Sequence, residues 1–249
     1  MEWIIIVSVS LMLLFVFLKS RLFGVLAWFL FGISWILKIP YYVHVEDYFN
    51  VSLLILAFLI FSLIAFAILK TNKIEVFVRL TSLSALAAIA YFPFALNDYL
   101  KEMLIKMVVN HTVLLGNLFG FHFYYNNHKI IVNDKTVNII LACTGIESMA
   151  LFFGVTMATK AEFKRNLAAF LVSVPTIYFL NLLRNIFVSL SYGYSWFGEN
   201  SFYIAHHVIS KFLATLALIL ISLAVFKIIP ELLDLLYDVK NEIKAVVIR

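Results

Sequence analysis

Long apolar segments, separated by short connections that carry most of the charges, dominate this sequence. Segment 51–69, for example, contains no charged side chain. A helix rises about 1.5 Å per residue, so a segment of this length crosses a hydrocarbon core of about 30 Å. Hydrophobic residues make up 64% of the chain and charged residues 13%, far from the composition of a soluble domain. The sequence therefore predicts an all-α polytopic membrane protein.

About seven transmembrane helices are predicted, within a range of about six to eight. The predicted spans are 3–18, 22–39, 51–69, 80–96, 143–158, 167–190 and 205–226. Lys and Arg follow the first span and fill the connections 70–79 and 160–165. The positive-inside rule assigns these connections to the cytoplasm, which predicts an external N-terminus and a cytoplasmic C-terminus. We read the net charge of +5 in the same way, as topology information and not as affinity for nucleic acid.

Three segments depart from this pattern. Segment 103–119 is apolar but contains Lys106, Asn110, His111 and Asn117, which are costly at the bilayer centre. It is interpreted as an interfacial or re-entrant helix on the outer side, and a further membrane crossing stays open. The β-branched and aromatic stretch 121–140, with its Asn-Asn and Asn-Asp-Lys turn signals, predicts a small extracytoplasmic extended or hairpin element. The tail 231–249 predicts a cytoplasmic amphipathic helix on the membrane surface.

Three reactive side chains fall at one predicted depth. Measured from the basic residues at the other ends of their spans, Cys143, Arg184 and His206 lie roughly 25, 28 and 31 Å away. For a hydrocarbon core of about 30 Å, all three are near the outer face. Their spans are consecutive and joined by short connections, which favours neighbouring positions in the bundle.

This group supports nucleophilic catalysis by a thiolate. A helix N-terminus and a nearby cation favour the thiolate form of a cysteine, and a histidine can pass a proton to a leaving amine. Arg184 cannot lose its proton, so it would stabilise the thiolate or the oxyanion of a tetrahedral intermediate. Thr144 and Gly145 allow backbone amides to approach a carbonyl closely. The predicted reaction is acyl transfer through a thioester formed on Cys143.

Each side chain also has a structural interpretation. Cys143 could be a small buried hydrophobe, and Arg184 could reach the headgroups or pair with Glu147. Asn181 could hydrogen-bond a neighbouring helix. In another class of function, a small transporter or channel, Asn181, Arg184 and His206 would line a solute path; a non-catalytic scaffold is a third. The histidine spacing predicts no metal site, and no cofactor is expected.

Three short motifs together resemble a known family. They are Ala-Cys-Thr-Gly-Ile-Glu-Ser at 142–148, Asn-Leu-Leu-Arg-Asn at 181–185 after Pro175, and Ala-His-His at 205–207. In order, spacing and helical context they resemble the successive signatures of the exosortase/archaeosortase family of polytopic membrane transpeptidases, in an archaeosortase-like form. The match covers about 112–227, which we take as the catalytic core of a single integral-membrane domain, 1–249.

The resemblance implies roles for individual residues. Cys143 is the nucleophile, Arg184 the essential arginine and His206 the third member, with the adjacent His207 as the alternative. Thr144, Gly145 and Asn181 are possible supporting residues.

It also implies substrates and a location. The partners are exported proteins whose C-terminal sorting signal consists of a short motif, a transmembrane helix and a basic end, together with a membrane lipid acceptor; no nucleic acid is involved. The enzyme would be a multi-pass protein of the cell membrane, with its active site on the extracytoplasmic face.

Overall fold

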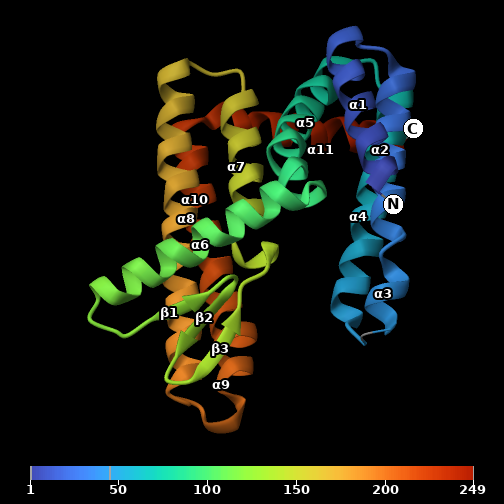
Figure 1. The fold of residues 1–249 in the computed structure, drawn as a ribbon. Helices are drawn as coiled ribbons and strands as arrows, with labels where there is room; N and C mark the ends of the chain where they lie inside the picture. Colours follow the sequence, from blue (N-terminus) through green and yellow to red (C-terminus); the bar gives the residue numbers. More distant parts are fainter. Residues whose placement is uncertain (1, 45, 249) are drawn as a thin grey trace. The chain divides into compact units, whose positions relative to one another are not determined.

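The structure, a computed structural model, describes residues 2–44 and 46–248 (Figure 1). Arg249, the last residue of the predicted tail, lies outside the described residues. Contacts between Cα atoms divide the chain into two compact units. The first unit comprises Met1–Ile89, Met157–Ala161 and Pro230–Arg249, and the second comprises Ala90–Thr156 and Glu162–Ile229. Organisation as a single domain, 1–249, stays a prediction.

Helices make up most of both units. They are α1 (Glu2–Leu18), α2 (Arg21–Ile36), α3 (Ile39–His44), α4 (Tyr48–Lys70), α5 (Ile74–Leu96), α6 (Asp98–Leu118), α7 (Ile146–Ala158), α8 (Phe163–Gly193), α9 (Ser201–Tyr203), α10 (Ser210–Ile228) and α11 (Pro230–Val247). Among the described residues, five helical segments are long and apolar enough to cross a membrane: Arg21–His44, Asn50–Lys70, Ile74–Leu96, Phe163–Gly193 and Gly198–Ile228. Trp3–Leu18 and Ile146–Ala158 are shorter apolar helices. The predicted all-α polytopic class is confirmed.

The end of the predicted span 22–39 differs in the structure. Helix α2 ends at Ile36, and Pro40, which directly follows the predicted span and would be expected to end its helix, lies inside α3. Proline is compatible with the first turn of a helix, where its missing N–H has no intrahelical partner to lose. Helical structure therefore continues beyond Pro40 to His44.

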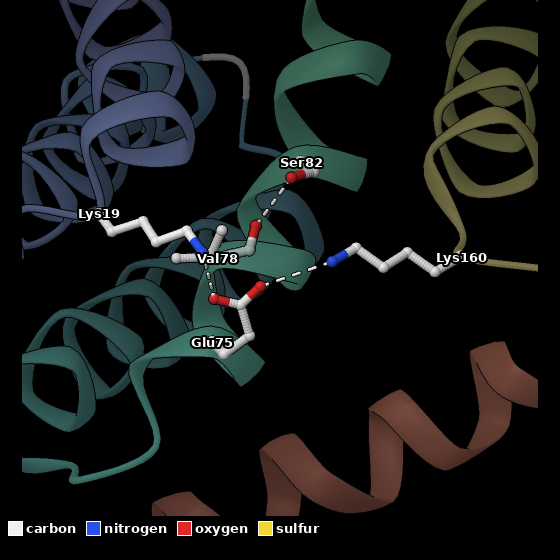
Figure 2. A network of polar contacts seen from close by, with 5 residues as sticks. All are labelled: Lys19, Glu75, Val78, Ser82 and Lys160. Atoms are coloured by element: carbon white, nitrogen blue, oxygen red, sulfur yellow. Dashed lines mark hydrogen bonds and ion pairs between the residues drawn. The ribbon is translucent and has the colours of Figure 1, made fainter.

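Ion pairs join three separate parts of the first unit (Figure 2). The Glu75 carboxylate accepts from the Nζ atoms of Lys19 at 3.0 Å and Lys160 at 3.5 Å. All three side chains are largely exposed, so each pair contributes little to stability. The contacts nevertheless bring together the end of α1, the start of α5 and the short stretch around Lys160 that belongs to the first unit. The positive-inside rule assigns these segments to one side of the membrane, and which face that is stays a prediction.

The predicted amphipathic tail is a helix, α11, with part of its apolar face covered by protein. Leu232, Leu235 and Val239 are buried, and α11 contacts α4. The Glu242 carboxylate accepts from Thr71 Oγ1 at 2.8 Å and pairs with Lys73 Nζ at 2.9 Å. The expected surface helix is therefore also a packing element of the first unit.

A three-stranded antiparallel sheet precedes Cys143, where an extended or hairpin element was expected. Its strands are β1 (Tyr124–Asn126), β2 (Lys129–Val132) and β3 (Lys135–Asn138), in the order β1-β2-β3. The predicted turn residues Asn127, Asn133 and Asp134 have φ angles of 53°, 48° and 61°. Asn and Asp tolerate this left-handed region, and positive φ at both Asn133 and Asp134 fits a tight two-residue hairpin turn.

The sheet packs into the core of the second unit. Ile130, Val132 and Val137 point into a cluster formed with α6 and α8. A Cβ atom at Gly193 would lie 2.8 Å from Val132 Cγ1, so β2 approaches the end of α8 as closely as a glycine permits. Asn133 Nδ2 also donates to the Gly193 carbonyl at 3.2 Å. The chain is thereby fixed just before it reaches Cys143.

All but the last residue of segment 103–119 is helical, as part of α6. Asn97 caps this helix by accepting from the Leu100 amide at 3.0 Å, and Leu104, Val108 and Val109 face the core. Helix α6 is not among the five segments that are long and apolar enough to span a membrane. Its interfacial or re-entrant placement stays a prediction.

Candidate active site

Cys143 ends a single 3₁₀ turn, Leu141–Cys143, that leads into α7. The Cys143 amide donates to the Ile140 carbonyl at 2.8 Å, and the Thr144 amide donates to the Leu141 carbonyl at 3.0 Å. The thiol is free and the residue is partly exposed. Cys143 thus lies three residues before α7, on the side of its positive dipole end.

Thr144 and Gly145 form the link between this turn and α7. Thr144 is fully buried, and its hydroxyl donates to the Leu141 carbonyl at 2.7 Å while accepting from the Ile146 amide at 3.3 Å. Gly145 has a φ of 76°, a conformation that glycine adopts without steric cost. The Thr144 amide already donates within the turn, so it is not available to bind a substrate carbonyl in this conformation. The bonds of Thr144 instead stabilise the turn.

Two asparagines of α8 bind the Cys143 turn. The Nδ2 atoms of Asn181 and Asn185 both donate to the Cys143 carbonyl, at 2.8 and 3.1 Å. Both asparagines are buried. Asn181 was predicted as a possible supporting residue, and no role was predicted for Asn185. The spacing of four residues, which places both amides on one helix face, was the available signal.

Arg184 lies between these asparagines and contacts His206. Its Nη2 is 3.4 Å from His206 Nδ1. A guanidinium has no acceptor, so Nδ1 accepts this bond and the ring hydrogen is on Nε2. The prediction that Arg184 and His206 share one level of neighbouring helices agrees with this contact.

His206 lies in a π-helical turn, Ile204–Ile209, where the backbone is wider than in an α-helix. Its ring stacks on Phe202 with a centroid distance of 5.1 Å and an interplanar angle of 13°. His207 is exposed and meets Tyr203 at 5.3 Å. The printed geometry places the His206 ring beside Arg184, with Nδ1 as the atom that faces the guanidinium.

Glu147, which was a possible partner of Arg184, contacts Tyr91 instead. The Tyr91 hydroxyl donates to its carboxylate at 3.4 Å. Among the described ion pairs, none joins Glu147 to Arg184. The guanidinium is therefore directed to an imidazole, not neutralised by a carboxylate.

A cavity of about 570 Å³ opens beside these residues, between the start of α7 and the helices α8 and α10. Its wall is mainly apolar, with Asn181, Arg184, Glu147 and Lys211 as its larger polar groups. The apolar part comes from Ile177, Leu180, Leu183, Phe187, Leu213, Ala214, Ala217, Leu218 and Ile221. Ala142 and Gly145, on either side of the Cys143–Thr144 pair, line it as well.

The predicted residues are brought together in two separate groups. Arg184 meets His206, and Asn181 with the newly found Asn185 meets the Cys143 backbone. Among the described residues, no hydrogen bond joins the Cys143 sulfur to Arg184 or His206. Asn181 and Arg184 line the cavity without His206, so the wall lacks one member of the suggested solute path.

No group of three or more His, Cys, Asp or Glu side chains within residues 2–44 and 46–248 could hold a metal ion.

Comparison with known proteins gives matches along most of the chain. The family model described as transmembrane exosortase matches residues 3–223. The chain is 29% identical over 254 residues to a protein named archaeosortase A from Haloferax volcanii, covering 86% of this chain and 82% of that protein. It is 24% identical over 240 residues to an archaeosortase A from Natronomonas pharaonis, covering 84% and 76% of the two chains. No solved structure matches it.

Proposed function

The chain belongs to the transmembrane exosortase family, and we propose that it is a membrane-embedded cysteine transpeptidase that cleaves C-terminal sorting signals of exported proteins. One observation carries the proposal: a single turn of α8 binds the backbone of Cys143 through Asn181 and Asn185, and binds His206 through Arg184. All three family motifs therefore meet at one place. The functional roles below rest on that convergence.

In the proposed reaction, the Cys143 thiolate attacks the carbonyl carbon of the scissile peptide bond. The carbonyl π electrons move onto oxygen, and the Arg184 guanidinium stabilises that oxyanion through its fixed positive charge and its several donors. Collapse of the intermediate breaks the C–N bond and leaves a thioester between Cys143 and the new C-terminus.

The proton needed by the leaving amine comes from the thiol by way of His206. Its Nδ1 accepts a bond from Arg184 in the free enzyme, but the 3.4 Å separation is at the long end for a hydrogen bond. When the guanidinium turns to the substrate oxygen, Nδ1 becomes able to take the thiol proton. The resulting imidazolium then protonates the departing amine.

An amine-bearing membrane lipid is the proposed acceptor for the second half of the reaction. Its amine attacks the thioester, loses a proton to the imidazole and releases the Cys143 sulfur. The apolar cavity along α8 and α10 suits a substrate that arrives within the membrane. A transporter or channel is not favoured, because His206 does not line the cavity that Asn181 and Arg184 share.

The direct test uses the full-length chain in lipid vesicles with a candidate substrate that carries a C-terminal motif, an apolar helix and a basic end. Intact-mass spectrometry is expected to show loss of the helix and basic end, together with the added mass of a lipid. The proposal would be contradicted if the substrate kept its C-terminal segment in the presence of folded wild-type enzyme and lipid. A product ending in a free carboxylate would assign hydrolysis in place of transfer.

The orientation can be tested on the same protein, because Cys143 is its only cysteine. A membrane-impermeant thiol reagent added to intact cells is expected to label Cys143, since the active site is proposed to face outward. The Cys143→Ala variant provides the unlabelled control. Labelling that requires permeabilisation of the membrane would reverse the proposed orientation.

A further inference from the structure

The carbonyl of Cys143 is bound more strongly than a short turn requires. A single 3₁₀ turn supplies only the two internal bonds from the Cys143 and Thr144 amides. Neither of these bonds involves the Cys143 carbonyl. That carbonyl instead accepts two hydrogen bonds from side chains that lie one turn apart on α8. Both lone pairs of this oxygen are therefore used.

Both donors are amides buried in a helix that is otherwise apolar enough to span a membrane. Asn181 is 9% exposed and Asn185 is 5% exposed. A buried amide without hydrogen bonds is costly, so each asparagine depends on the Cys143 carbonyl as much as the turn depends on the asparagine. Removing one asparagine leaves the Cys143 carbonyl with a single side-chain donor, and removing both leaves it with none.

The packing of Gly145 against Asn181 fixes the approach of the turn to α8. A Cβ atom at Gly145 would lie 3.2 Å from Asn181 Cγ and 3.3 Å from Asn181 Cβ. The backbone can come this close only because residue 145 has no side chain. The two hydrogen bonds from the asparagine side chains and this packing contact together hold the turn against one face of α8.

Arg184 is on the same turn of α8 as the two asparagines. A helix is stiff over one turn, so the segment that holds the Cys143 backbone also sets the position of the guanidinium. We propose that Asn181 and Asn185 are positioning residues, which hold the Cys143 turn in register with Arg184 by binding its carbonyl oxygen. The proposed register between nucleophile and guanidinium rests on the proposed transpeptidase function; the restraint on the turn does not.

The restraint can be measured without any substrate, because the lone thiol accepts a single nitroxide spin label. In full-length protein in vesicles, the label at Cys143 is expected to show a larger mobile fraction when Asn181 or Asn185 is replaced by Leu. Loss of one hydrogen bond is expected to raise the ratio of mobile to immobilised label roughly fivefold. Loss of both in the double variant is expected to raise it roughly 25-fold.

Ser189→Ala is the matched control. Ser189 is one turn beyond Asn185 on α8, is 1% exposed, and its hydroxyl has no hydrogen-bond partner in the described structure. This variant removes a buried polar atom from the same helix without touching Cys143, so the label spectrum should stay as in the wild type. If the double variant does not fold, the test is the label mobility of the single variant Asn185→Leu compared with that of Ser189→Ala.

Kinetics provide the second measurement. The Asn185→Leu variant is expected to lower kcat for substrate processing about tenfold with little change in KM, because Asn185 does not line the cavity. An unchanged mobile fraction in folded Asn variants would overturn the restraint, whatever the activity. A raised mobile fraction with unchanged kcat would keep the restraint and overturn its role in catalysis.

Discussion

Replacing Cys143 with Ala is expected to lower kcat/KM for sorting-signal cleavage by about 10⁴-fold or more, because no other group can form the thioester. Cys143→Ser should recover little of this activity, since a hydroxyl is a far weaker nucleophile without a strong base beside it. The measurement is the fraction of a co-expressed substrate that loses its C-terminal segment, followed by mass or gel mobility.

Folding must be shown separately for these variants. Cys143 is only partly buried, so the Ala change should alter the free energy of unfolding by about 1 kcal/mol or less. Ser189→Ala, at a buried site away from the cavity, should process substrate as the wild type does. Undiminished processing by the folded Cys143→Ala variant would end the thioester mechanism.

Arg184→Lys is expected to lower kcat by about 10²- to 10³-fold even though the charge is kept. An ammonium is a compact point charge, whereas the planar guanidinium offers donors in several directions. The lysine side chain can neither repeat the contact with His206 Nδ1 nor reach an oxyanion with the same geometry. Single-turnover cleavage at saturating substrate measures this step apart from product release.

Arg165→Lys is the matched substitution at the opposite end of the same helix. Arg165 Nε donates to the Ile228 carbonyl at 2.9 Å, which is a structural contact between α8 and α10. Its loss should cost about 1 kcal/mol of stability and leave kcat of the folded enzyme unchanged. Equal kinetic losses in both variants would mean that Arg184 acts through stability and has no specific part in catalysis.

Local sequence signals were sufficient to predict most elements of the fold. The apolar lengths identified the helices, and Asn-Asn and Asn-Asp identified both turns of the sheet, because these residues tolerate positive φ. They did not foresee the helix beyond Pro40, since a proline is read as a stop although it is compatible with a first turn. They also could not show that α11 buries Leu232 and Leu235, which depends on packing with distant parts of the chain.

The depth of the candidate site in the membrane stays a prediction, and the rotation of its helices about their axes could not be predicted from the sequence. Counting residues from the basic ends placed Arg184 and His206 at one level, and they contact each other at 3.4 Å. Which face of α8 meets Cys143 depends on helix packing, which spacing alone does not determine. The role of Asn185 and the π-helical turn at His206 therefore emerged only from the three-dimensional arrangement.

The pairing of Glu242 with Thr71 and Lys73 has a consequence for the order of synthesis. A ribosome completes the second unit at Ile229 before it makes any of the tail that starts at Pro230. Until then Thr71, which is 1% exposed in the finished protein, lacks its carboxylate partner. A nascent chain arrested just short of Pro230 thus already carries Cys143, Arg184 and His206, while its first unit still lacks α11.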